Sequence, residues 1–281
     1  MTRLQKAILK TLIYADIFDY PLTKSEINHW LIWQHKTPPP DINKTLSSFS
    51  KSNSYYYLPS RKSIIKIRQS RSRFSKSKLK QAHRISRYLS LILTIKLIAI
   101  TGALSMNNSH KHDDIDLLII TKSNRLWLTR LFSILLLELL QLRRRPQARQ
   151  TTNKICLNLF LDESSLQLPA SQRNLYTAHE VSQIKPIFNK QSTYQKFLNQ
   201  NSWVKNYLPN AINITKSPSK PSTFPVDLFN WFEILAYKLQ FFYMKSKITN
   251  ETISRTRAFF HPRQTNKIVL NQYHQKLKTF L

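Results

Sequence analysis

Glycine and acidic residues are the scarce components of this sequence. The chain of 281 residues contains one glycine, Gly102, and 14 Asp and Glu residues against 44 Lys and Arg, which gives a formal net charge of +30 at pH 7. An average protein of this length contains roughly 20 glycines. Such an excess of positive charge attracts polyanions, which include nucleic acids, nucleotides and anionic membranes.

A bias in genome composition is a second explanation of the charge. Gly, Asp, Glu, Val and Ala are encoded by codons that begin with G, and together they make up only 30 of the 281 residues. Because all five types are scarce at once, mutational drift explains part of the imbalance, and the sequence leaves both explanations open. Where Gly and Asp are retained against this drift, we expect the backbone or the chemistry to require them.

Cysteine is equally rare, since Cys156 is the only one. A single cysteine excludes an intrachain disulfide, which is typical of a reducing compartment, and the N-terminus lacks the apolar stretch of a signal peptide. The most apolar run, residues 126–142, contains Arg130 and Glu138, which favours a buried helix over a membrane span. We therefore expect a cytoplasmic protein without an integral membrane segment.

The order of the expected elements indicates an α+β protein whose first region, residues 1–70, resembles a winged helix. Apolar residues there recur at helical spacing, and Thr23 with Glu26 forms a capping box that starts a helix. The elements expected in this region are helices over residues 4–13, 23–33 and 42–52, and strands on either side of a turn at residues 59–62. The order helix, helix, helix, hairpin is that of a winged helix, a helix-turn-helix variant.

A basic stretch follows, because no acidic residue occurs between Ile42 and His112. We expect part of it, residues 75–91, to be a helix. The cations near its middle are Arg68, Arg71, Arg73, Lys76, Lys78, Lys80, Arg84 and Arg87. Two interpretations stay open, a solvated basic face and an electrostatic track for phosphate groups.

The second region, residues 71–165, is expected to form a small sheet core flanked by helices. Apolar and β-branched runs predict strands over residues 93–101, 115–121 and 153–162, and a long helix over residues 125–142. In the third strand, simple alternation places on one face Cys156, Asn158, Phe160 and Asp162.

The third region, residues 166–281, is expected to be helical. Apolar residues recur at helical spacing in three segments of it. These segments are residues 171–188, 193–207 and 226–245, and a Pro- and Ser-rich linker is expected at residues 210–225.

The retained glycine and aspartates meet in one stretch, ITGALSMNNSHKHDDIDLLIIT, residues 100–121. An apolar strand runs into Gly102, which permits a turn and a close backbone approach, and Asp114 and Asp116 open the next strand. Side chains two positions apart in a strand share a face, so these two carboxylates repel each other unless a cation lies between them. Mg²⁺, which binds carboxylates together with substrate phosphates, is the expected ion.

Gly102 followed by Asp114 and Asp116, with strands on both sides, resembles the nucleotidyltransferase signature of the DNA polymerase beta superfamily over about residues 75–163. The resemblance implies that the aspartates are catalytic and bind Mg²⁺ or Mn²⁺, and that the turn binds a nucleoside triphosphate. Ala103 stands where the family usually has Ser or Gly. The residues assigned to the triphosphate on this basis are Gly102, Ala103, Ser105, as a substitute hydroxyl, and Lys111.

The family also uses a third carboxylate from a later strand as a metal ligand. Residues 153–162 offer Asn158, which is well placed in the middle of the strand but neutral, and Asp162, which is charged but lies at the strand's end. Asp162 is the candidate third metal ligand by charge and Asn158 the candidate by position. The sequence leaves open which residue is the third ligand. Because catalysis depends on that ligand, it also leaves open whether the protein is an active enzyme.

Three functions are compatible with these features. The first is a metal-dependent transfer of a nucleoside monophosphate from a triphosphate to a hydroxyl of RNA, protein or a small molecule. The second is a catalytically degenerate protein of the same fold that binds nucleic acid or regulates, which the basic charge, Ala103 and Asn158 favour. The third is a peripheral membrane protein that uses the basic surface, for which no amphipathic anchor stands out.

The remaining chemical features are given structural roles. His110 and His112 are expected in a solvated loop rather than in a transition-metal site, and Cys156 is expected as a packed strand residue. The aromatic residues 229–245 are expected to be a core helix rather than a platform for stacked bases. The segment 250–266 is expected to be a surface loop rather than a cover over a nucleotide, although it contains Arg255, Arg257, His261 and Arg263.

Overall fold

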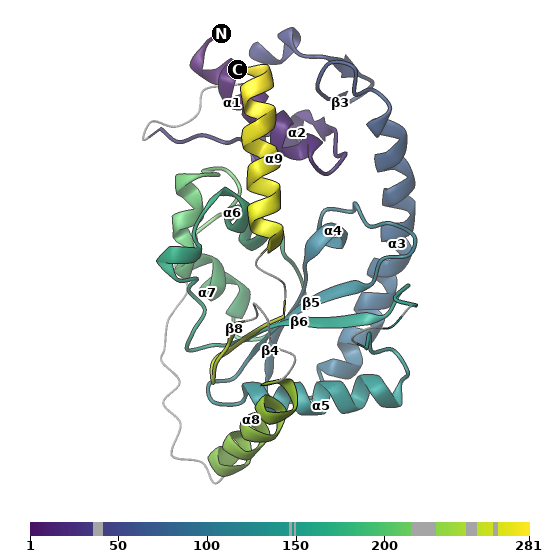
Figure 1. The fold of residues 1–281 in the computed structure, drawn as a ribbon, viewed down its shortest axis with the longest axis vertical. Helices are drawn as coiled ribbons and strands as arrows, with labels where there is room; N and C mark the ends of the chain where they lie inside the picture. The colour runs from purple at the N-terminus through teal and green to yellow at the C-terminus, as the bar shows by residue number, and fades with distance from the viewer. Residues whose placement is uncertain (36–41, 146–147, 149, 215–228, 246–251, 261–263) are drawn as a thin grey trace.

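The computed structural model describes residues 1–35, 42–145, 148, 150–214, 229–245, 252–260 and 264–281. The architecture is α+β, as expected, with a small antiparallel sheet near the N-terminus and a mixed six-stranded sheet. In Figure 1 the N-terminal unit forms one end of the molecule, the large sheet lies towards the other end, and α3 (Ile64–Leu89) runs between them. Both ends of the chain lie at the end formed by the N-terminal unit.

The N-terminal unit combines two short helices, a 3₁₀ turn and three two-residue strands. These elements are α1 (Arg3–Asp16), β1 (Leu22–Thr23), α2 (Lys24–His29), η1 (Thr45–Ser48), β2 (Lys51–Ser52) and β3 (Tyr55–Tyr56). Strand β3 pairs antiparallel with both β1 and β2. The predicted capping box is confirmed, since the Thr23 hydroxyl accepts from the Glu26 amide at 3.3 Å and Glu26 accepts from the Thr23 amide at 2.8 Å.

Two helix predictions in this unit are wrong in length. Helix α2 ends at His29 rather than at residue 33, because the amide of Ile32 donates to the Thr11 hydroxyl at 3.0 Å instead of to a helical carbonyl. The helix expected over residues 42–52 is reduced to the single turn η1. The chain at residues 51–56 instead turns back as the hairpin of β2 and β3.

Helix α3 is longer than expected and replaces the second strand of the predicted hairpin. It starts at Ile64 rather than near residue 75 and runs for 26 residues to Leu89. Its first apolar residues, which suggested a strand, are buried positions of the helix. Arg68 of α3 holds the Glu26 carboxylate with two hydrogen bonds of 2.8 and 2.7 Å, which fixes the helix to the N-terminal unit.

The six-stranded sheet has the strand order β7-β4-β5-β6-β9-β8. Strands β5 and β6 are parallel, and every other neighbouring pair is antiparallel. The bounds are β4 (Ile95–Ile100), β5 (Ile115–Thr121), β6 (Ile155–Asp162), β7 (Lys185–Asn189), β8 (Thr252–Ile253) and β9 (Arg257–Phe259). The first three strands lie within the three stretches that the sequence predicts as strands.

The region after residue 165 is not only helical, contrary to expectation. The helix predicted over residues 171–188 is divided into α6 (Leu175–Gln183) and β7, and the segment expected to be a surface loop at residues 250–266 supplies β8 and β9. The other elements are η2 (Ala170–Gln172), α7 (Thr193–Gln200), η3 (Ser202–Asn206), α8 (Phe229–Lys245) and α9 (Gln264–Phe280). Most of the linker expected at residues 210–225 lies outside the described residues.

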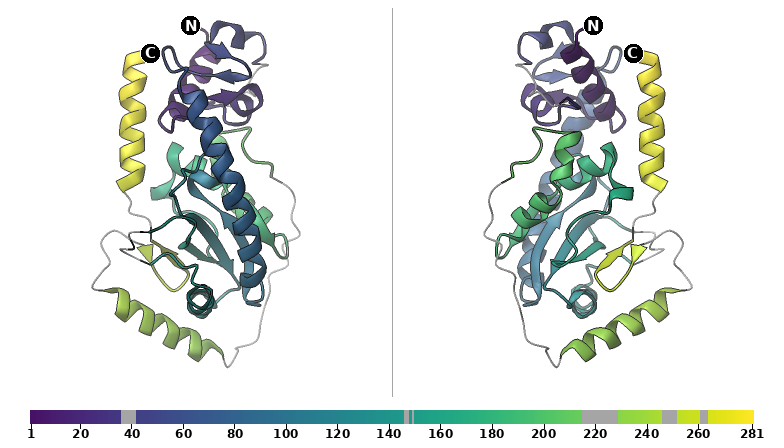
Figure 2. Two further views of the ribbon diagram at one scale, coloured as in Figure 1. Left: turned by 90° about the vertical axis from the view of Figure 1, so that its right-hand side faces the viewer. Right: turned by 90° about the vertical axis from the view of Figure 1, so that its left-hand side faces the viewer.

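Helices cover both faces of the large sheet (Figures 1 and 2). Helices α3, α5 (Leu126–Leu139) and α8 share one buried apolar cluster with sheet residues such as Ile98 and Ile119. The N-terminal unit, α6, α7 and α9 share the other cluster with residues such as Leu97 and Leu118. Because the second cluster includes residues of both the N-terminal unit and the sheet, buried apolar side chains form a continuous connection between these two parts.

A β-bulge in β6 decides which of its side chains meet β5. Asp116 pairs with Cys156 and Leu118 pairs with Leu159, so two residues of β6 oppose a single residue of β5. Simple alternation therefore fails beyond Asn158. Phe160 joins the apolar cluster of α3 and α5, whereas Leu159 and Leu161 join the opposite cluster, which reverses the faces predicted for this half of the strand.

Helix α8 is not the core helix that its composition suggests. It buries Ala236 and Met244 against α5, but Trp231, Phe242 and Tyr243 are 62%, 83% and 67% exposed. Within the described residues, no helix has both the length and the apolar character that crossing a bilayer requires.

Candidate functional site

The only glycine of the chain joins β4 to α4 (Gly102–Ser105). Its φ angle is +61°, in the left-handed region that residues with a side chain adopt only at a cost. A Cβ atom at this position would lie 3.0 Å from Oδ2 of Asp116. The backbone conformation and the close approach to a carboxylate therefore both explain why glycine is retained here.

The loop between α4 and β5 is held in place from α3. Lys78 is only 2% exposed, and its Nζ donates to the Asp113 carbonyl and, at 2.9 Å, to Oδ1 of Asn153. The Asp113 carboxylate accepts from the backbone amide of His110 at 2.6 Å, which closes the turn. Asp113 is thus a structural residue, and its role is to fix the approach to Asp114.

Asp114 and Asp116 lie together, as the sequence predicts, with Gly102 beside them. One ligand atom from each aspartate and the Sγ of Cys156 all lie within 4.8 Å of one another. Burial, followed by the neighbouring charge of Asp114, raises the pKa of Asp116 to about 7. A carboxyl group with such a pKa is one that a bound cation would return to the ionised form.

Three further side chains complete the surroundings of the aspartates, and the motif marks only Asn158 among them as a candidate ligand. Nη1 of Arg144 lies 2.7 Å from Oδ2 of Asp114 and 3.5 Å from Sγ of Cys156. The amide of Asn158 donates to Asp116 and accepts from the Cys156 thiol. Burial and the nearby aspartates raise the pKa of Cys156 to about 12, so the thiol is protonated.

Of the two candidates for the third ligand position, the structure places Asn158 there and Asp162 elsewhere. Asp162 pairs with Thr121 at the far end of the parallel strands, whereas Cys156 pairs with Asp116. The carboxylate of Asp162 accepts from the backbone amides of Asn124 and Ser164. The proposal of Asp162 as a metal ligand is therefore wrong, and its role is to cap the loops that follow β5 and β6.

The residues assigned to the triphosphate have unequal access to the site. Gly102 and Ala103 line the cavity beside Asp116, and Ala103 is exposed. The hydroxyl of Ser105 is buried and donates to the Gly102 carbonyl at 2.7 Å, so it does not replace the missing hydroxyl of the family pattern. Lys111, like His110 and His112 on either side of it, is exposed on the turn before β5.

The donor set around the aspartates fits a divalent cation. Two carboxylates and an amide oxygen are ligands that Mg²⁺ and Mn²⁺ accept, whereas a thiol suits softer ions. The residues that would hold the ion are Asp114 and Asp116, with Cys156 and Asn158 next to them. With the neutral amide of Asn158 in place of a third carboxylate and the sulfur of Cys156 nearby, this set favours Mn²⁺ over Mg²⁺.

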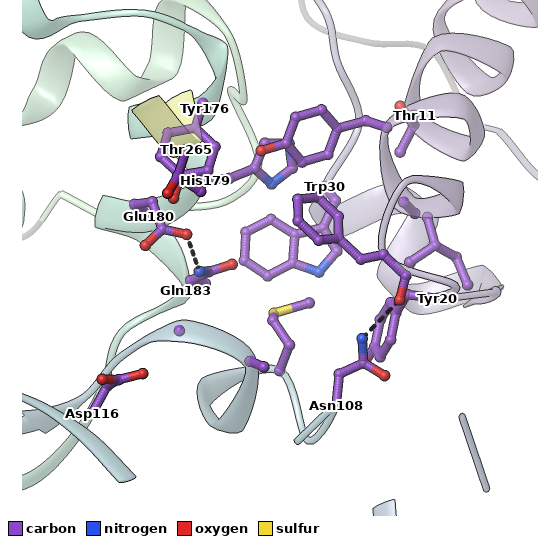
Figure 3. A pocket seen from close by; sticks show the side chains of 17 residues that line it. Thr11, Tyr20, Trp30, Asn108, Asp116, Tyr176, His179, Glu180, Gln183 and Thr265 are labelled. Atoms are coloured by element: carbon purple, nitrogen blue, oxygen red, sulfur yellow. Dashed lines mark hydrogen bonds between the residues drawn. The ribbon is translucent and has the colours of Figure 1, made fainter. Parts of the chain in front are cut away.

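A cavity of about 240 Å³ opens beside Asp116 (Figure 3). It lies between the N-terminal unit, the Gly102 turn and α6, and its wall includes Trp30 from the first, Ala103 from the second and Glu180 from the third. In Figure 3 Asp116 lies at one end and the side chains of α6 face the ring of Trp30. Neither Trp30 nor the residues of α6 are marked as functional by any motif, and only the fold brings them to Asp116.

Glu180 is the second carboxyl group of this cavity. Burial, followed by the charge of Asp116, raises its pKa to about 7, although the Gln183 amide donates to it at 2.5 Å. Its neighbour His179 is 7% exposed, and burial lowers the pKa of the imidazole to about 3. At neutral pH this wall therefore presents a neutral imidazole and a carboxyl group close to its titration point.

Chemically, the site can hold one divalent cation between Asp114 and Asp116 and a small molecule in the adjoining cavity. A cation so placed is adjacent to whatever the cavity binds, because Asp116 belongs to both.

No protein-family model, curated protein or solved structure matches this chain, so the functional argument depends on this geometry.

Proposed function

We propose that the chain is a metal-dependent nucleotidyltransferase, which moves a nucleoside monophosphate from a nucleoside triphosphate to a hydroxyl acceptor. The observation that carries the proposal is the contact between the Gly102 turn and Asp116, with Asp114 as the second carboxylate. The order α3, β4, α4, β5, α5, β6 around it supports the resemblance to the DNA polymerase beta superfamily.

In the proposed reaction, the acceptor oxygen attacks the α-phosphorus of the triphosphate. The new oxygen–phosphorus bond forms as the bond to the bridging oxygen of the β-phosphate breaks. Pyrophosphate leaves with that electron pair, and the hydroxyl proton passes to water. A divalent ion held by Asp114 and Asp116 would supply charge stabilisation to both the attacking and the leaving oxygens.

The replacement of the third carboxylate by Asn158 has a definite chemical consequence. A neutral amide next to Asp116 gives the ion one negative ligand fewer, which lowers its affinity. Arg144 further offsets the charge of Asp114. We therefore expect a transferase that needs a high concentration of metal ion and works better with Mn²⁺ than with Mg²⁺.

The test is a transfer assay with the purified full-length chain. The protein is incubated with Mn²⁺ or Mg²⁺ and each α-labelled nucleoside triphosphate, in the presence of total RNA and of cell lysate, and the label is followed into macromolecules and small molecules. Asp114→Asn and Asp116→Asn keep the side-chain shapes and should abolish transfer. Absence of any labelled acceptor, or labelling that persists in both variants, would show that this pair does not catalyse nucleotidyl transfer.

A specific surface favours nucleic-acid binding as a second candidate function. Six exposed cations follow one face of α3, and within the described part of the chain none of them forms an ion pair. They are Lys66, Arg73, Lys76, Lys80, Arg84 and Arg87, here called the α3 stripe. At 1.5 Å per residue the α3 stripe is about 30 Å long, and Figure 2 shows α3 along the outside of the molecule. The helices and three-stranded sheet of the N-terminal unit support the winged-helix comparison.

Salt dependence tests the second function independently of catalysis. Binding of labelled duplex and single-stranded probes should weaken steeply as salt rises, because each phosphate contact releases counterions. The triple variant Lys80→Gln, Arg84→Gln and Arg87→Gln should reduce the slope by about three. The matched control is Lys196→Gln, Lys205→Gln and Lys238→Gln, which removes equal charge away from α3. Equal losses in the two variants would indicate a general effect of net charge and not a nucleic-acid site on α3.

A further inference from the structure

The cavity beside Asp116 has a charge opposite to that of the molecule. Its lining includes the carboxyl groups of Asp116 and Glu180, and among the described residues that line it none is Lys or Arg. The whole chain has 44 Lys and Arg against 14 Asp and Glu. A general bias towards basic residues would place Lys and Arg in the wall rather than carboxyl groups. The acidic lining is therefore not a consequence of the overall composition of the chain.

Two arginines that contact residues of the cavity wall, Arg68 and Arg71, are already engaged by other groups. Arg71 donates to the carbonyl of Phe18 at 2.8 Å and to Asp19 at 3.3 Å. Arg68 is held by Glu26 and lies over the ring of Tyr20, 4.1 Å from its centroid. Neither of these guanidinium groups pairs with a carboxyl group of the cavity. The cation that acts on Asp116 is Arg144, which pairs with Asp114.

Aromatic rings make up much of the remaining wall. The rings are those of Tyr14, Phe18, Tyr20, Trp30 and Tyr176. The imidazole of His179 stacks on Tyr14 with centroids 3.9 Å apart and lies 5.4 Å from Trp30, so several ring planes are fixed against one another. Ring faces attract organic cations, most strongly where water is excluded.

One polar atom of the wall has no partner. Nε2 of His179 is buried, and within the described part of the chain nothing forms a hydrogen bond with it. His179 lines the cavity and is more than nine-tenths buried, with an exposed fraction of 7%. Less than 1 Å² of this atom is accessible, so the neutral imidazole contributes its ring rather than this nitrogen to the cavity.

We propose that this cavity binds a small organic ammonium ion, whose charge is met by Glu180 and the aromatic rings. An anionic ligand would meet two carboxyl groups and, among the described residues of the wall, no basic side chain, which costs binding energy. A neutral aromatic ligand fits the rings but leaves the charge of the wall uncompensated. A protonated amine satisfies the carboxyl group and the rings together.

The position of the cavity also gives the ligand a role. Asp116 lines the cavity and belongs to the candidate metal pair, so a bound amine whose hydroxyl group faces Asp116 would present that group where transfer would occur. The ammonium compound would then be the acceptor of the nucleoside monophosphate. This assignment of a role rests on the proposed function, whereas the binding of an amine does not.

Three probes with the same ring distinguish charge from apolar fit. Phenethylamine is a cation, 2-phenylethanol is neutral and 3-phenylpropionate is an anion at pH 7.5. Each is titrated into the full-length chain by calorimetry, without metal ion or nucleotide, so that failure of transfer does not affect the result. We expect phenethylamine to bind at least tenfold more tightly than 2-phenylethanol and 3-phenylpropionate not to bind. Equal binding of the three, or no binding of the amine at millimolar concentration, overturns the proposal.

Two substitutions localise the binding. Glu180→Gln removes the charge but keeps the shape, and should weaken phenethylamine about tenfold while leaving 2-phenylethanol unchanged. Ala103→Leu, at an exposed position of the cavity wall, should weaken both probes by occupying the space without disturbing the core. The matched control is Glu163→Gln, a carboxyl group outside the cavity. Undiminished amine binding in both cavity variants would place the ligand elsewhere and refute the proposal.

Discussion

Nη1 of Arg144 lies 2.7 Å from Oδ2 of Asp114, so a guanidinium group of the chain itself lies next to the candidate metal site. Arg144→Gln should tighten Mn²⁺ binding about tenfold, because it removes a unit charge close to the ion. Electron paramagnetic resonance of free Mn²⁺ measures the affinity. The neighbouring Arg145 pairs with Glu138 instead, which makes Arg145→Gln the control. Equal affinities in the two variants would mean that Asp114 does not contact the ion.

Gly102→Ala is expected to destabilise the fold by about 2 kcal/mol. The left-handed backbone is strained for alanine, and the added Cβ would lie too close to the Asp116 carboxylate. Gly102→Asn should lose less, because Asn tolerates this conformation better than Ala. Both variants introduce the Cβ that displaces the Asp116 carboxylate, so both should weaken Mn²⁺ binding equally. Urea unfolding and Mn²⁺ titration separate the two effects. Wild-type metal affinity in both variants would contradict a role of this contact in the site.

Asn158→Asp should raise the affinity for Mg²⁺ measured with a nonhydrolysable triphosphate, because it adds a negative ligand next to Asp116. Without metal the same variant should be less stable at pH 8, where the added carboxylate repels Asp116. Asp162→Asn is the comparison, since it should reduce stability through the lost amide contacts but leave metal binding unchanged. Loss of metal binding in Asp162→Asn would restore that residue as a ligand.

Glu180→Gln should make the protein more stable at pH 8 and leave it almost unchanged at pH 4.5. Burial raises the pKa of Glu180 from its ordinary value to about 7, so the folded state holds this proton more tightly than the unfolded state. The stabilisation is present below the unfolded pKa and is lost as pH rises towards 7. At pH 8 the free energy of unfolding of Glu180→Gln should therefore exceed that of the wild type by about 2 kcal/mol. Urea unfolding from pH 4.5 to 8 provides the measurement, with Glu163→Gln as the control, and parallel profiles would contradict the assignment.

The sequence predicts the centre of the sheet and the aspartate pair well. Strands β4, β5 and β6 are long enough for apolar patterning to reveal them, and the Gly102 and Asp116 positions stand out because composition disfavours both residue types. The capping box at Thr23 is equally local, and it is confirmed. Signals of this kind depend only on neighbours in sequence, which is why they succeed without knowledge of the fold.

The missed features depend on residues distant in sequence. Strands β8 and β9 have two and three residues, too few for a pattern of alternation. Strand β7 overlaps the helix predicted over residues 171–188, although Pro186 within it is unfavourable in a helix and is tolerated in an edge strand. The bulge of β6 leaves no mark in its composition, and so the reversal at Phe160 was not foreseen.

The cavity is likewise a product of the fold. Trp30 and Glu180 are 150 positions apart, and neither belongs to a recognisable motif. In the sequence Arg144 is the middle residue of three consecutive arginines that follow the predicted helix, and nothing in that run distinguishes it from Arg145. Packing of α6 and the N-terminal unit against the sheet brings such residues to Asp116, and local patterns do not encode that packing.

The pairing of β6 with β9 has a consequence for how the chain is made. Leu159 of β6 pairs with Phe259 of β9, which is synthesised 100 residues after it. The pairing therefore cannot form until those residues have left the ribosome. At 5–20 residues per second, the open edge of β6 persists for about 5 to 20 s during synthesis. An open strand edge is a template for pairing with other nascent chains. A truncated protein that ends before Arg257 would lack β9, so the edge of β6 would stay unpaired. We expect such truncated proteins to aggregate more than the complete chain.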